Sequence, residues 1–263
     1  MKLICCADLH LGRISSVPKD AEDNQNNFSS EKAWYRIIDL AVEEEADAIL
    51  VAGDVFDKDT YEFTSKKILE ESLKKLKDKN IQVIMIPGNH DLKLLEKVVN
   101  NIKCSSNYDF LKIIGCGCKW ESIDLKGLQI LGYGLDKDQE KKNPFERFYQ
   151  YIKLSEKYIL MLHGDYTTND SKYAPFRESL SGEKIQNSLI TLIGHTHKYE
   201  DKGKYISLGS PQANDFGEKG PHGVLVLDLD SNFNIINREY RQISNIYYEQ
   251  VNVDVSNLGS NLL

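Results

Sequence analysis

The chain has 263 residues and a formal net charge of −7 at pH 7, from 33 Lys and Arg against 40 Asp and Glu. This length permits a large hydrophobic core, arranged as one domain or two, and no stretch approaches the roughly 20 apolar residues that span a bilayer. The acidic balance argues against nucleic acid as a partner, because nucleic-acid-binding domains are usually basic.

The N-terminus runs directly into the first polar motif described below, so a signal peptide could not be removed without destroying that motif. We therefore expect a cytoplasmic protein with no membrane partner.

The five cysteines fit reduced thiols. Cys5 and Cys6 lie in the first predicted strand, where a small buried hydrophobe is the ordinary role of cysteine. Cys104, Cys116 and Cys118 lack a clear fourth partner for zinc.

The predicted elements alternate between short apolar strands and amphipathic helices. In chain order they are strand 3–7, a polar loop at 15–30, helix 30–45, strand 48–52, helix 64–79, strand 81–86, helix 92–101, short strands 111–114, 120–125 and 128–131, helix 144–153, strand 159–162, an irregular segment at 164–183, and strands 189–193, 205–208, 224–229 and 234–240. By itself this periodicity predicts only a mixed α/β fold. The loop at 15–30 is either a substrate-handling element, because it lies beside the first motif, or a solvated connector.

Five of the six histidines lie in five short polar segments, and only His222 lies outside them. The segments are Asp8-Leu9-His10, Gly53-Asp54, Gly88-Asn89-His90-Asp91, His163-Gly164 and Gly194-His195-Thr196-His197. Each segment closes an apolar run that is predicted to be a strand. Because strand ends deliver side chains to one edge of a sheet, where open α/β sheets bind ligands, we expect these residues to meet at one place.

This mixture of imidazole, carboxylate and amide oxygen suits divalent ions such as Mn²⁺, Fe²⁺ or Zn²⁺. The absence of thiolate argues against a closed structural zinc site. The potential ligands number seven, too many for one tetrahedral ion: Asp8, His10, Asp54, Asn89, His163, His195 and His197. If Asp54 bridges, they divide between two ions, which at a separation of about 3.5–4 Å can act together on a phosphoryl group. The alternative is that these are ordinary polar residues in loops.

The ordered pattern resembles that of the calcineurin-like metallophosphoesterases, across residues 8–197. The resemblance implies a four-layer α/β/β/α sandwich with mixed sheets and flanking helices. It also implies that one ion takes Asp8, His10, Asp54 and His197, and that the other takes Asp54, Asn89, His163 and His195. His90 would then assist the leaving oxygen as a general acid, and Asp91 would hold His90 in orientation.

Further local features are similar to the SbcD-type nuclease subunit of DNA double-strand-break repair. They are Leu11-Gly12 after His10, Val55-Phe56-Asp57 after Asp54, and Gly209-Ser210-Pro211 and the stretch 215–220 after His197. The resemblance covers residues 1–240, which we expect to form the catalytic domain. Residues 241–263 are expected to form a C-terminal strand or tail, with an alternating run at 248–255. Such subunits continue into a capping domain and a helical segment that grips an SbcC-type ATPase partner, and neither is apparent here.

The resemblance therefore implies a metal-dependent DNA exonuclease or endonuclease acting in repair. Two Mn²⁺ ions are expected first, with Fe²⁺, Zn²⁺, Mg²⁺ or Ni²⁺ as alternatives, and bound ions would offset part of the acidic charge. Four cations near the motifs are candidates for contacts to backbone phosphates: Arg13, Lys58, Lys93 and Lys198.

Two other functions remain open from the sequence. One is a metallophosphatase or phosphodiesterase that acts on small molecules or phosphoproteins, with the same metal chemistry. The other is a non-catalytic binding module in which the metals form a docking surface. His90 and Asp91 argue against the binding module, because turnover needs them and binding does not.

Overall fold

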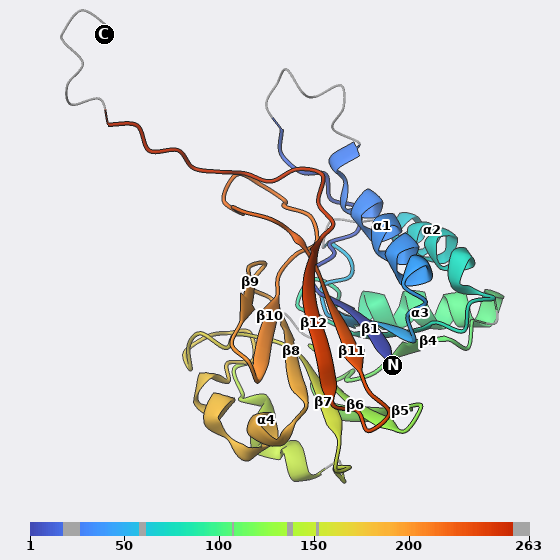
Figure 1. The fold of residues 1–263 in the computed structure, drawn as a ribbon, viewed down its shortest axis with the longest axis vertical. Helices are drawn as coiled ribbons and strands as arrows, with labels where there is room; N and C mark the ends of the chain where they lie inside the picture. The colour runs from blue at the N-terminus through green and yellow to red at the C-terminus, as the bar shows by residue number, and fades with distance from the viewer. Residues whose placement is uncertain (18–26, 58–61, 107, 136–138, 151–152, 255–263) are drawn as a thin grey trace, which may run out of the picture.

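The computed structural model of the chain describes residues 1–17, 27–57, 62–106, 108–135, 139–150 and 153–254. Two six-stranded sheets pack face to face, with helices on their outer faces (Figure 1). The sandwich that the resemblance implies, with mixed parallel and antiparallel sheets and flanking helices, is therefore confirmed.

The first sheet has the order β12-β11-β1-β2-β3-β4. Its strands are β1 (Lys2–Cys6), β2 (Ala48–Ala52), β3 (Gln82–Ile86), β4 (Leu111–Ile113), β11 (Gly223–Leu229) and β12 (Ile235–Gln242). β1 to β4 are parallel, whereas β11 and β12 run antiparallel to their neighbours. β2 is buried along its whole length, which explains its continuous apolar run, because a parallel strand covered on both faces has no solvent side.

The second sheet has the order β5-β6-β7-β8-β10-β9. Its strands are β5 (Trp120–Leu125), β6 (Leu128–Tyr133), β7 (Tyr158–His163), β8 (Ile190–Gly194), β9 (Tyr199–Asp201) and β10 (Tyr205–Leu208). β6, β7, β8 and β10 are parallel, and β5 and β9 are antiparallel edge strands. β7 and β8 therefore end at the same edge, with His163 beside Gly194.

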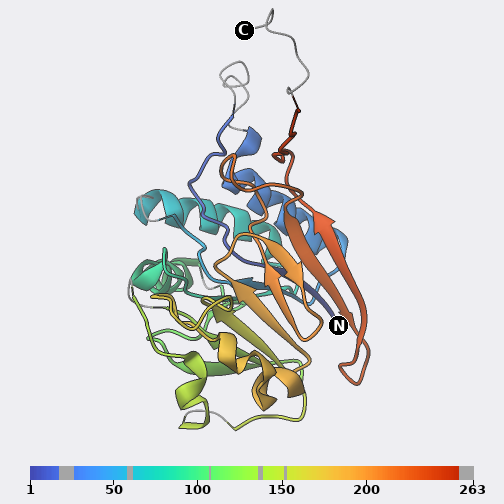
Figure 2. The same cartoon turned by 90° about the vertical axis from the view of Figure 1, so that its left-hand side faces the viewer.

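Three apolar clusters separate the four layers. Along β1, Leu3 and Cys5 point to the cluster between the sheets, whereas Ile4 and Cys6 point to the cluster under the helices, as the two-residue period of a strand requires. The elements of the outer layers are α1 (Ser30–Glu43), α2 (Glu62–Leu73), η2 (Lys74–Leu76) and α3 (Leu92–Ser106) on the first sheet, and η3 (Pro144–Gln150), η4 (Arg177–Ser181) and α4 (Glu183–Asn187) on the second. Figure 2 shows these layers from a direction at right angles to Figure 1.

The helix α1 illustrates how the sequence sets the helical layer. Ser29 caps its N-terminus by accepting a hydrogen bond from the backbone N–H of Lys32. Its buried face includes Ala33, Trp34 and Ile37, and the Trp34 indole N–H donates to the Ser72 hydroxyl at 2.6 Å. Within the described residues, the helices are too short or too polar to cross a bilayer.

The predicted helices and strands differ from the structure at a few places. The helix predicted at 144–153 is a 3₁₀ helix over Pro144–Gln150, and the short elements η4, α4 and β9 were not predicted. The alternating run from 248 to 254 forms no strand, and its one bridge joins Tyr248 to Lys219. Val251 and Val253 are 77% and 74% exposed. The apolar face that this alternating run would present as a strand is therefore not packed against a sheet.

The polar loop predicted at 15–30 lies partly outside the described residues, at 18–26. Its two described ends meet in an antiparallel bridge between Ile14 and Ser29. Ser15 is buried and donates to the Phe28 carbonyl at 2.7 Å, and its hydroxyl also contacts the Ala213 carbonyl. The base of this loop is therefore anchored to the segment that follows β10.

Candidate dimetal site

The polar motifs meet where the strands of the two sheets end. Asp8 and His10 follow β1, Asp54 follows β2, and Asn89 follows β3, all in the first sheet. From the second sheet, His163 ends β7 and the segment containing His195 and His197 follows β8. The site therefore lies across the ends of both sheets, and the predicted ligands follow or end five different strands.

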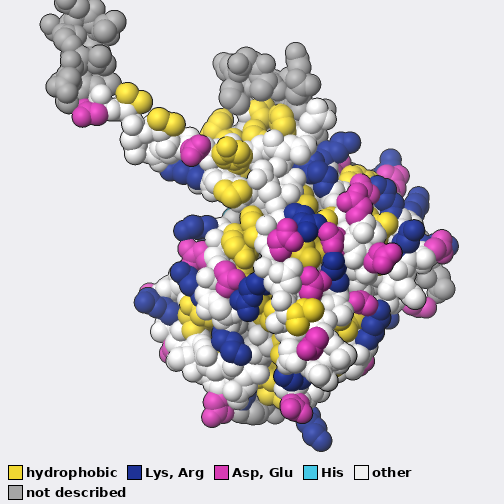
Figure 3. Space-filling view, viewed as in Figure 1, with side chains coloured by type: hydrophobic (Ala, Val, Ile, Leu, Met, Phe, Trp, Pro, Cys, Tyr) yellow, Lys and Arg dark blue, Asp and Glu magenta, His cyan; other side chains and the backbone are white. Residues whose placement is uncertain are grey.

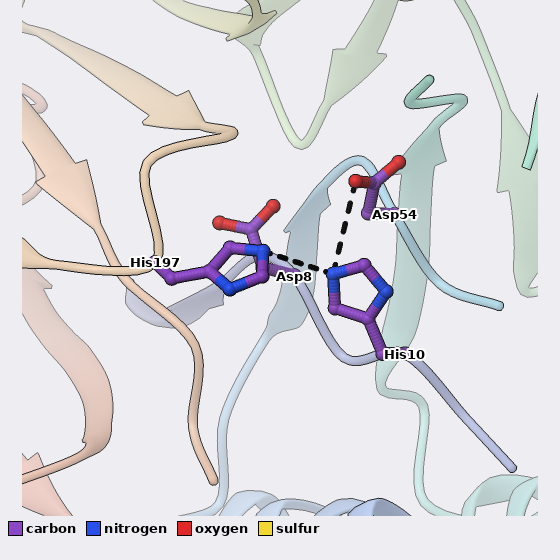
Figure 4. A group of neighbouring side chains, drawn as sticks. All are labelled: Asp8, His10, Asp54 and His197. Atoms are coloured by element: carbon purple, nitrogen blue, oxygen red, sulfur yellow. Dashed lines mark hydrogen bonds and ion pairs between the residues drawn. The ribbon is translucent and has the colours of Figure 1, made fainter. Parts of the chain in front are cut away.

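The first group of side chains is Asp8, His10, Asp54 and His197 (Figure 4). One potential ligand atom from each lies within 4.8 Å of the others. The His10 and His197 Nε2 atoms are 3.0 Å apart, and the His10 Nε2 atom is 3.8 Å from Asp54 Oδ2. Two nitrogen ligands at about 2.1 Å from one ion, at right angles, lie about 3 Å apart. The spacing of these two rings therefore fits a shared divalent ion.

The second group is Asp54, Asn89, His163 and His195. The Asn89 Oδ1 atom is 3.0 Å from both His163 Nε2 and His195 Nδ1, and Asp54 Oδ2 is 3.4 Å from His163 Nε2. The other nitrogen of His163 lies 2.9 Å from the Ala52 carbonyl, to which it must donate. The Nε2 lone pair of a neutral His163 would then face the Asn89 oxygen, also an acceptor, and a cation between them removes this conflict.

Without a metal, the second group attracts a proton instead. Burial lowers the pKa of His163, but the adjacent Asp54 carboxylate outweighs burial and raises it to about 9. The buried site therefore favours positive charge at this imidazole. A divalent ion would supply that charge and leave the imidazole neutral, as metal ligation requires.

The backbone at this site is unusual. Five of the seven predicted ligands have positive φ angles, a conformation that costs energy for residues other than glycine. These residues are Asp8 (52°), His10 (45°), Asp54 (51°), His195 (112°) and His197 (53°). Such strain persists only where surrounding contacts enforce it, and it is typical of functional sites.

Close packing explains the glycines that precede two of the ligands. A Cβ atom on Gly53 would lie 2.2 Å from His163 Nδ1, and Gly53 also has a φ of +90°. A Cβ atom on Gly88 would lie 2.1 Å from Asp54 Oδ1. Any larger residue at either position would displace a predicted ligand, which accounts for the Gly-Asp and Gly-Asn pairs in the sequence.

Hydrogen bonds orient three of the predicted ligands within the site. Both Asp8 carboxylate oxygens lie 3.0 Å from the backbone nitrogen of His195, which donates to them, and Asp54 Oδ1 accepts from the backbone N–H of His90 at 2.7 Å. His197 Nδ1 contacts Glu218 Oε1 at 2.7 Å. Burial raises the pKa of Glu218, but His197 outweighs it and lowers this pKa to about 2. Glu218 is therefore a carboxylate that fixes the His197 ring.

The chain matches the model of the calcineurin-like phosphoesterase family over residues 1–227. The chain belongs to this family. It is 25% identical to the DNA double-strand break repair protein Mre11 of Nanoarchaeum equitans, over 96% of this chain and 79% of that protein. It is 26% identical to the uncharacterized metallophosphoesterase YhaO of Bacillus subtilis, over 97% of this chain and 64% of that protein. Both the family and the cluster of His and Asp residues indicate divalent metal binding.

Solved structures give the same fold at low sequence identity. A dimetal phosphatase from Danio rerio aligns with a TM-score of 0.55 and 11% identity, covering 95% of this chain and 99% of that one. The structure of TT1561 from Thermus thermophilus aligns with a TM-score of 0.52 and 13% identity, covering 92% and 98%. These likenesses concern the fold of this phosphoesterase and not its substrate.

The structure corrects the role predicted for Asp91. Its buried carboxylate accepts backbone N–H bonds from Val55 at 2.9 Å, Phe56 at 2.6 Å and Gly88 at 3.0 Å. Asp91 therefore fixes the loops after β2 and β3. The carboxylate that faces His90 belongs to Asp57, whose Oδ1 lies 3.1 Å from His90 Nδ1.

Asp57 also faces the first ligand group of this phosphoesterase. Its Oδ1 atom is 3.5 Å from His10 Nδ1, and the ring centroids of His10 and His90 are 4.7 Å apart. The contacts with His10 and His90 hold the pKa of Asp57 well below its usual range. The sequence pattern does not single out Asp57 or Glu218, which it contains only within the longer stretches 55–57 and 215–220.

Of the four predicted substrate cations, Arg13 and Lys198 pair with carboxylates. Arg13 Nη2 lies 3.7 Å from Asp215 Oδ2, and Lys198 Nζ donates to Glu200 Oε1 at 2.9 Å. Lys93 is exposed near the start of α3. Lys58 lies outside the described residues. A role for any of them in substrate binding stays a prediction.

Proposed function

We propose that this phosphoesterase is a two-metal-dependent phosphodiesterase that cleaves DNA in repair, with Mn²⁺ as the activating ion. The observation that carries the proposal is the position of Asp54 between two groups of potential ligands. Similarity to Mre11 proteins over nearly the whole chain supports DNA as the substrate. The SbcD-type resemblance extends the proposal to a catalytic domain within residues 1–240 and an SbcC-type ATPase partner.

Asp8, His10, Asp54 and His197 would hold one ion, and Asp54, Asn89, His163 and His195 the other. The bound ions would supply Lewis-acid polarisation of the phosphoryl oxygens and a water with a lowered pKa. The chain supplies the position of these ions through strand ends whose backbone is fixed by the hydrogen bonds described above.

His90 would protonate the leaving oxygen. Its Nδ1 atom faces Asp57, which leaves Nε2 on the opposite side of the ring for the substrate. The His90 side chain is 27% exposed, so it can reach a bound phosphodiester. The Asp57 carboxylate would hold the His90 ring in one orientation, which a general acid requires.

A second candidate function is hydrolysis of small phosphoesters or phosphoproteins. It is favoured by the pairing of Arg13 with Asp215 and of Lys198 with Glu200. Figure 3 also shows basic and acidic side chains intermingled over one face, with no separate basic area for a phosphate backbone. Both candidates use the same chemistry, so the substrate must distinguish them.

The test is a comparison of three substrates with Mn²⁺-loaded protein: labelled DNA, bis-p-nitrophenyl phosphate and p-nitrophenyl phosphate. The proposal expects cleavage of DNA and of the diester, with kcat/KM for DNA falling steeply as salt rises, because phosphate contacts release counterions. Hydrolysis of the monoester alone would support the phosphatase. A lack of turnover on all three substrates, with two ions bound, would leave a binding module.

A further inference from the structure

A cavity of about 610 Å³ lies beside the first ligand group. Its walls come from the segment after β8, the loop that precedes β11, and β12, and they include His197, Lys198, Tyr199, Lys219, His222 and Tyr240. Its volume lies within the roughly 300–1,000 Å³ of small-molecule sites. Because Lys198 and Lys219 are exposed, the cavity opens to solvent on their side.

The His197 ring connects this cavity with the ligand group. Its Nε2 atom faces His10, where an ion would bind, and its Nδ1 atom faces Glu218, which also lines the cavity. The cavity is thus on the side of the ring away from the ion. A ligand in it would lie next to the reacting phosphodiester, without replacing it.

His222 forms a buried part of the wall. It is 4% exposed, and its Nδ1 atom lies 2.8 Å from the Ser210 carbonyl, to which only an N–H can donate. A neutral ring then carries a lone pair on Nε2, and this atom has no hydrogen-bond partner among the described residues. Nε2 is enclosed within the wall, so His222 shapes this side of the cavity and does not contact a ligand through that atom.

Aromatic and cationic side chains form the rest of the wall. Tyr199 and Tyr240 pack on each other with ring centroids 4.1 Å apart. The Lys219 ammonium contacts the neutral Gln250 side chain, so that contact leaves its charge uncompensated. Lys198 is 76% exposed and pairs with Glu200 at 2.9 Å, and an exposed ion pair of this kind contributes little and can exchange for a phosphate.

We propose that this cavity binds the nucleotide next to the cleaved phosphodiester, with the base against the Tyr199–Tyr240 wall and a phosphate at Lys219. The inference rests on the proposed nuclease function. Aromatic rings for stacking and a lysine for the backbone phosphate are groups by which proteins hold a single-stranded nucleotide. They are combined here beside the predicted metal ligands.

The test measures binding of a labelled, phosphorothioate single-stranded oligonucleotide to the Mn²⁺-loaded protein by fluorescence anisotropy. One abasic residue is moved along the oligonucleotide, which removes a base and keeps its phosphate. Wild type should lose affinity by about 5- to 150-fold at one position, the range for loss of one base–aromatic stack. Tyr199→Leu should remove this position dependence. Lys219→Ala should weaken all oligonucleotides alike and reduce the salt slope by about 1.

Lys202→Ala is the matched control, because Lys202 is an exposed lysine after β9 that does not line the cavity. It should bind the oligonucleotides as wild type does. Thermal unfolding and metal content, measured for every variant, separate a local effect from misfolding. Loss of the abasic effect in Tyr199→Leu with unchanged metal content supports the subsite.

Outcomes for the subsite and for the proposed function are separable. If wild type cleaves DNA but shows no position dependence, or if Tyr199→Leu retains it, the subsite is wrong and the nuclease stands. If DNA is not cleaved while deoxynucleoside monophosphates bind wild type and not Tyr199→Leu, the nuclease is wrong and the cavity is a site for free nucleotides. Binding by neither ligand overturns the inference.

Discussion

The two ligand groups share Asp54 but are supported by different parts of the molecule. The second group is supported by strand ends: His163 is the last residue of β7, it is fully buried, and it contacts the carbonyl of Ala52 at the end of β2. In the first group, His197 is 24% exposed on its side chain and is held by Glu218, from the loop that precedes β11. The second group therefore includes a predicted ligand fixed in the core, and the first includes one held by a surface loop.

This difference predicts that the two proposed ions would not bind with equal affinity. A site formed by rigid strands is preorganised, so binding there needs little further ordering. The metal affinity of a site that is completed by a loop also depends on the contacts that hold that loop in place. Glu218 further accepts hydrogen bonds from the backbone N–H of Asn214 at 2.9 Å and from the Ser210 hydroxyl at 3.1 Å. We expect tighter binding at the second group, with the first filled at higher metal concentration.

The largest effect should follow removal of the residue that both groups share. Asp54→Asn and Asp54→Ala should each lose both ions and lower kcat/KM for the diester by about 10³-fold or more, since two-metal catalysis contributes several kcal/mol. Metal content after gel filtration is the measurement, with circular dichroism to verify folding. A variant that keeps one tightly bound ion would show that Asp54 belongs to a single group.

His90 should separate chemistry from metal binding. His90→Ala is expected to keep two ions and to lower kcat by about 10²–10⁴-fold, the usual contribution of a general acid. Loss of an ion from this variant would identify His90 as a ligand. Asp57→Asn should show a milder loss of kcat, because the amide still accepts a hydrogen bond from the imidazole but carries no charge.

Asp91→Asn is the contrasting variant. Its three backbone donors would face one amide oxygen and an amino group, so at least one buried N–H loses its acceptor, at a cost of about 1–3 kcal/mol. We expect a lower melting temperature in the metal-loaded protein. If kcat for the diester fell as far in this variant as in Asp57→Asn at a temperature where both are folded, the assignment of Asp57 as the partner of His90 would be wrong.

Much of this molecule can be predicted from the sequence because its signals are local. The run at 48–52 predicts β2 with its observed ends, and the polar residues after each buried strand predict that the motifs converge. Both inferences need only strand periodicity and the rule that parallel strands end at one edge. The four-layer sandwich and the ligand sets came from the family resemblance.

The contacts of Asp91 and Glu218 could not be predicted from the sequence, because they depend on the direction of the side chains. Asp91 directly follows His90, yet its carboxylate turns inward because three backbone N–H groups at the ends of β2 and β3 need an acceptor. Glu218 lies 21 residues after His197 and meets it only because β9 and β10 return the chain to the site. Neither direction is encoded in spacing or hydrophobic pattern, so tertiary contacts decide both.

Glu218 provides the most direct test of the contrast between the groups. Glu218→Ala should lower the affinity of the first ion by about 10- to 100-fold, the usual effect of losing the partner of a metal-bound imidazole, and leave the second unchanged. Competition titration against a chelator resolves the two steps. Glu96→Gln on the exposed face of α3 is the control for loss of one negative charge. An equal loss of affinity for both ions would mean that the loop supports the whole site.

The smallest expected effect is the pH dependence of metal binding. In the metal-free protein, burial lowers the pKa values of His163 and His197, but Asp54 and Glu218, respectively, outweigh it and raise each to about 9. These raised values stabilise the metal-free fold fully below the ordinary histidine pKa of about 6.5, and this stability is lost as pH rises through about 9. At pH 7.5 each ion must displace about one proton, since ligating imidazole is neutral.

The apparent affinity of each ion should therefore rise by about tenfold per pH unit from about pH 7 to 8.5. Calorimetry in two buffers of different ionisation enthalpy counts the protons released at each step. Glu218→Gln removes the charge that raises the His197 pKa, so it should reduce proton release for the first ion and leave that of the second, which depends on His163 and Asp54. Equal reduction at both steps would show that the two groups titrate as one unit, and the contrast between core and loop would fail.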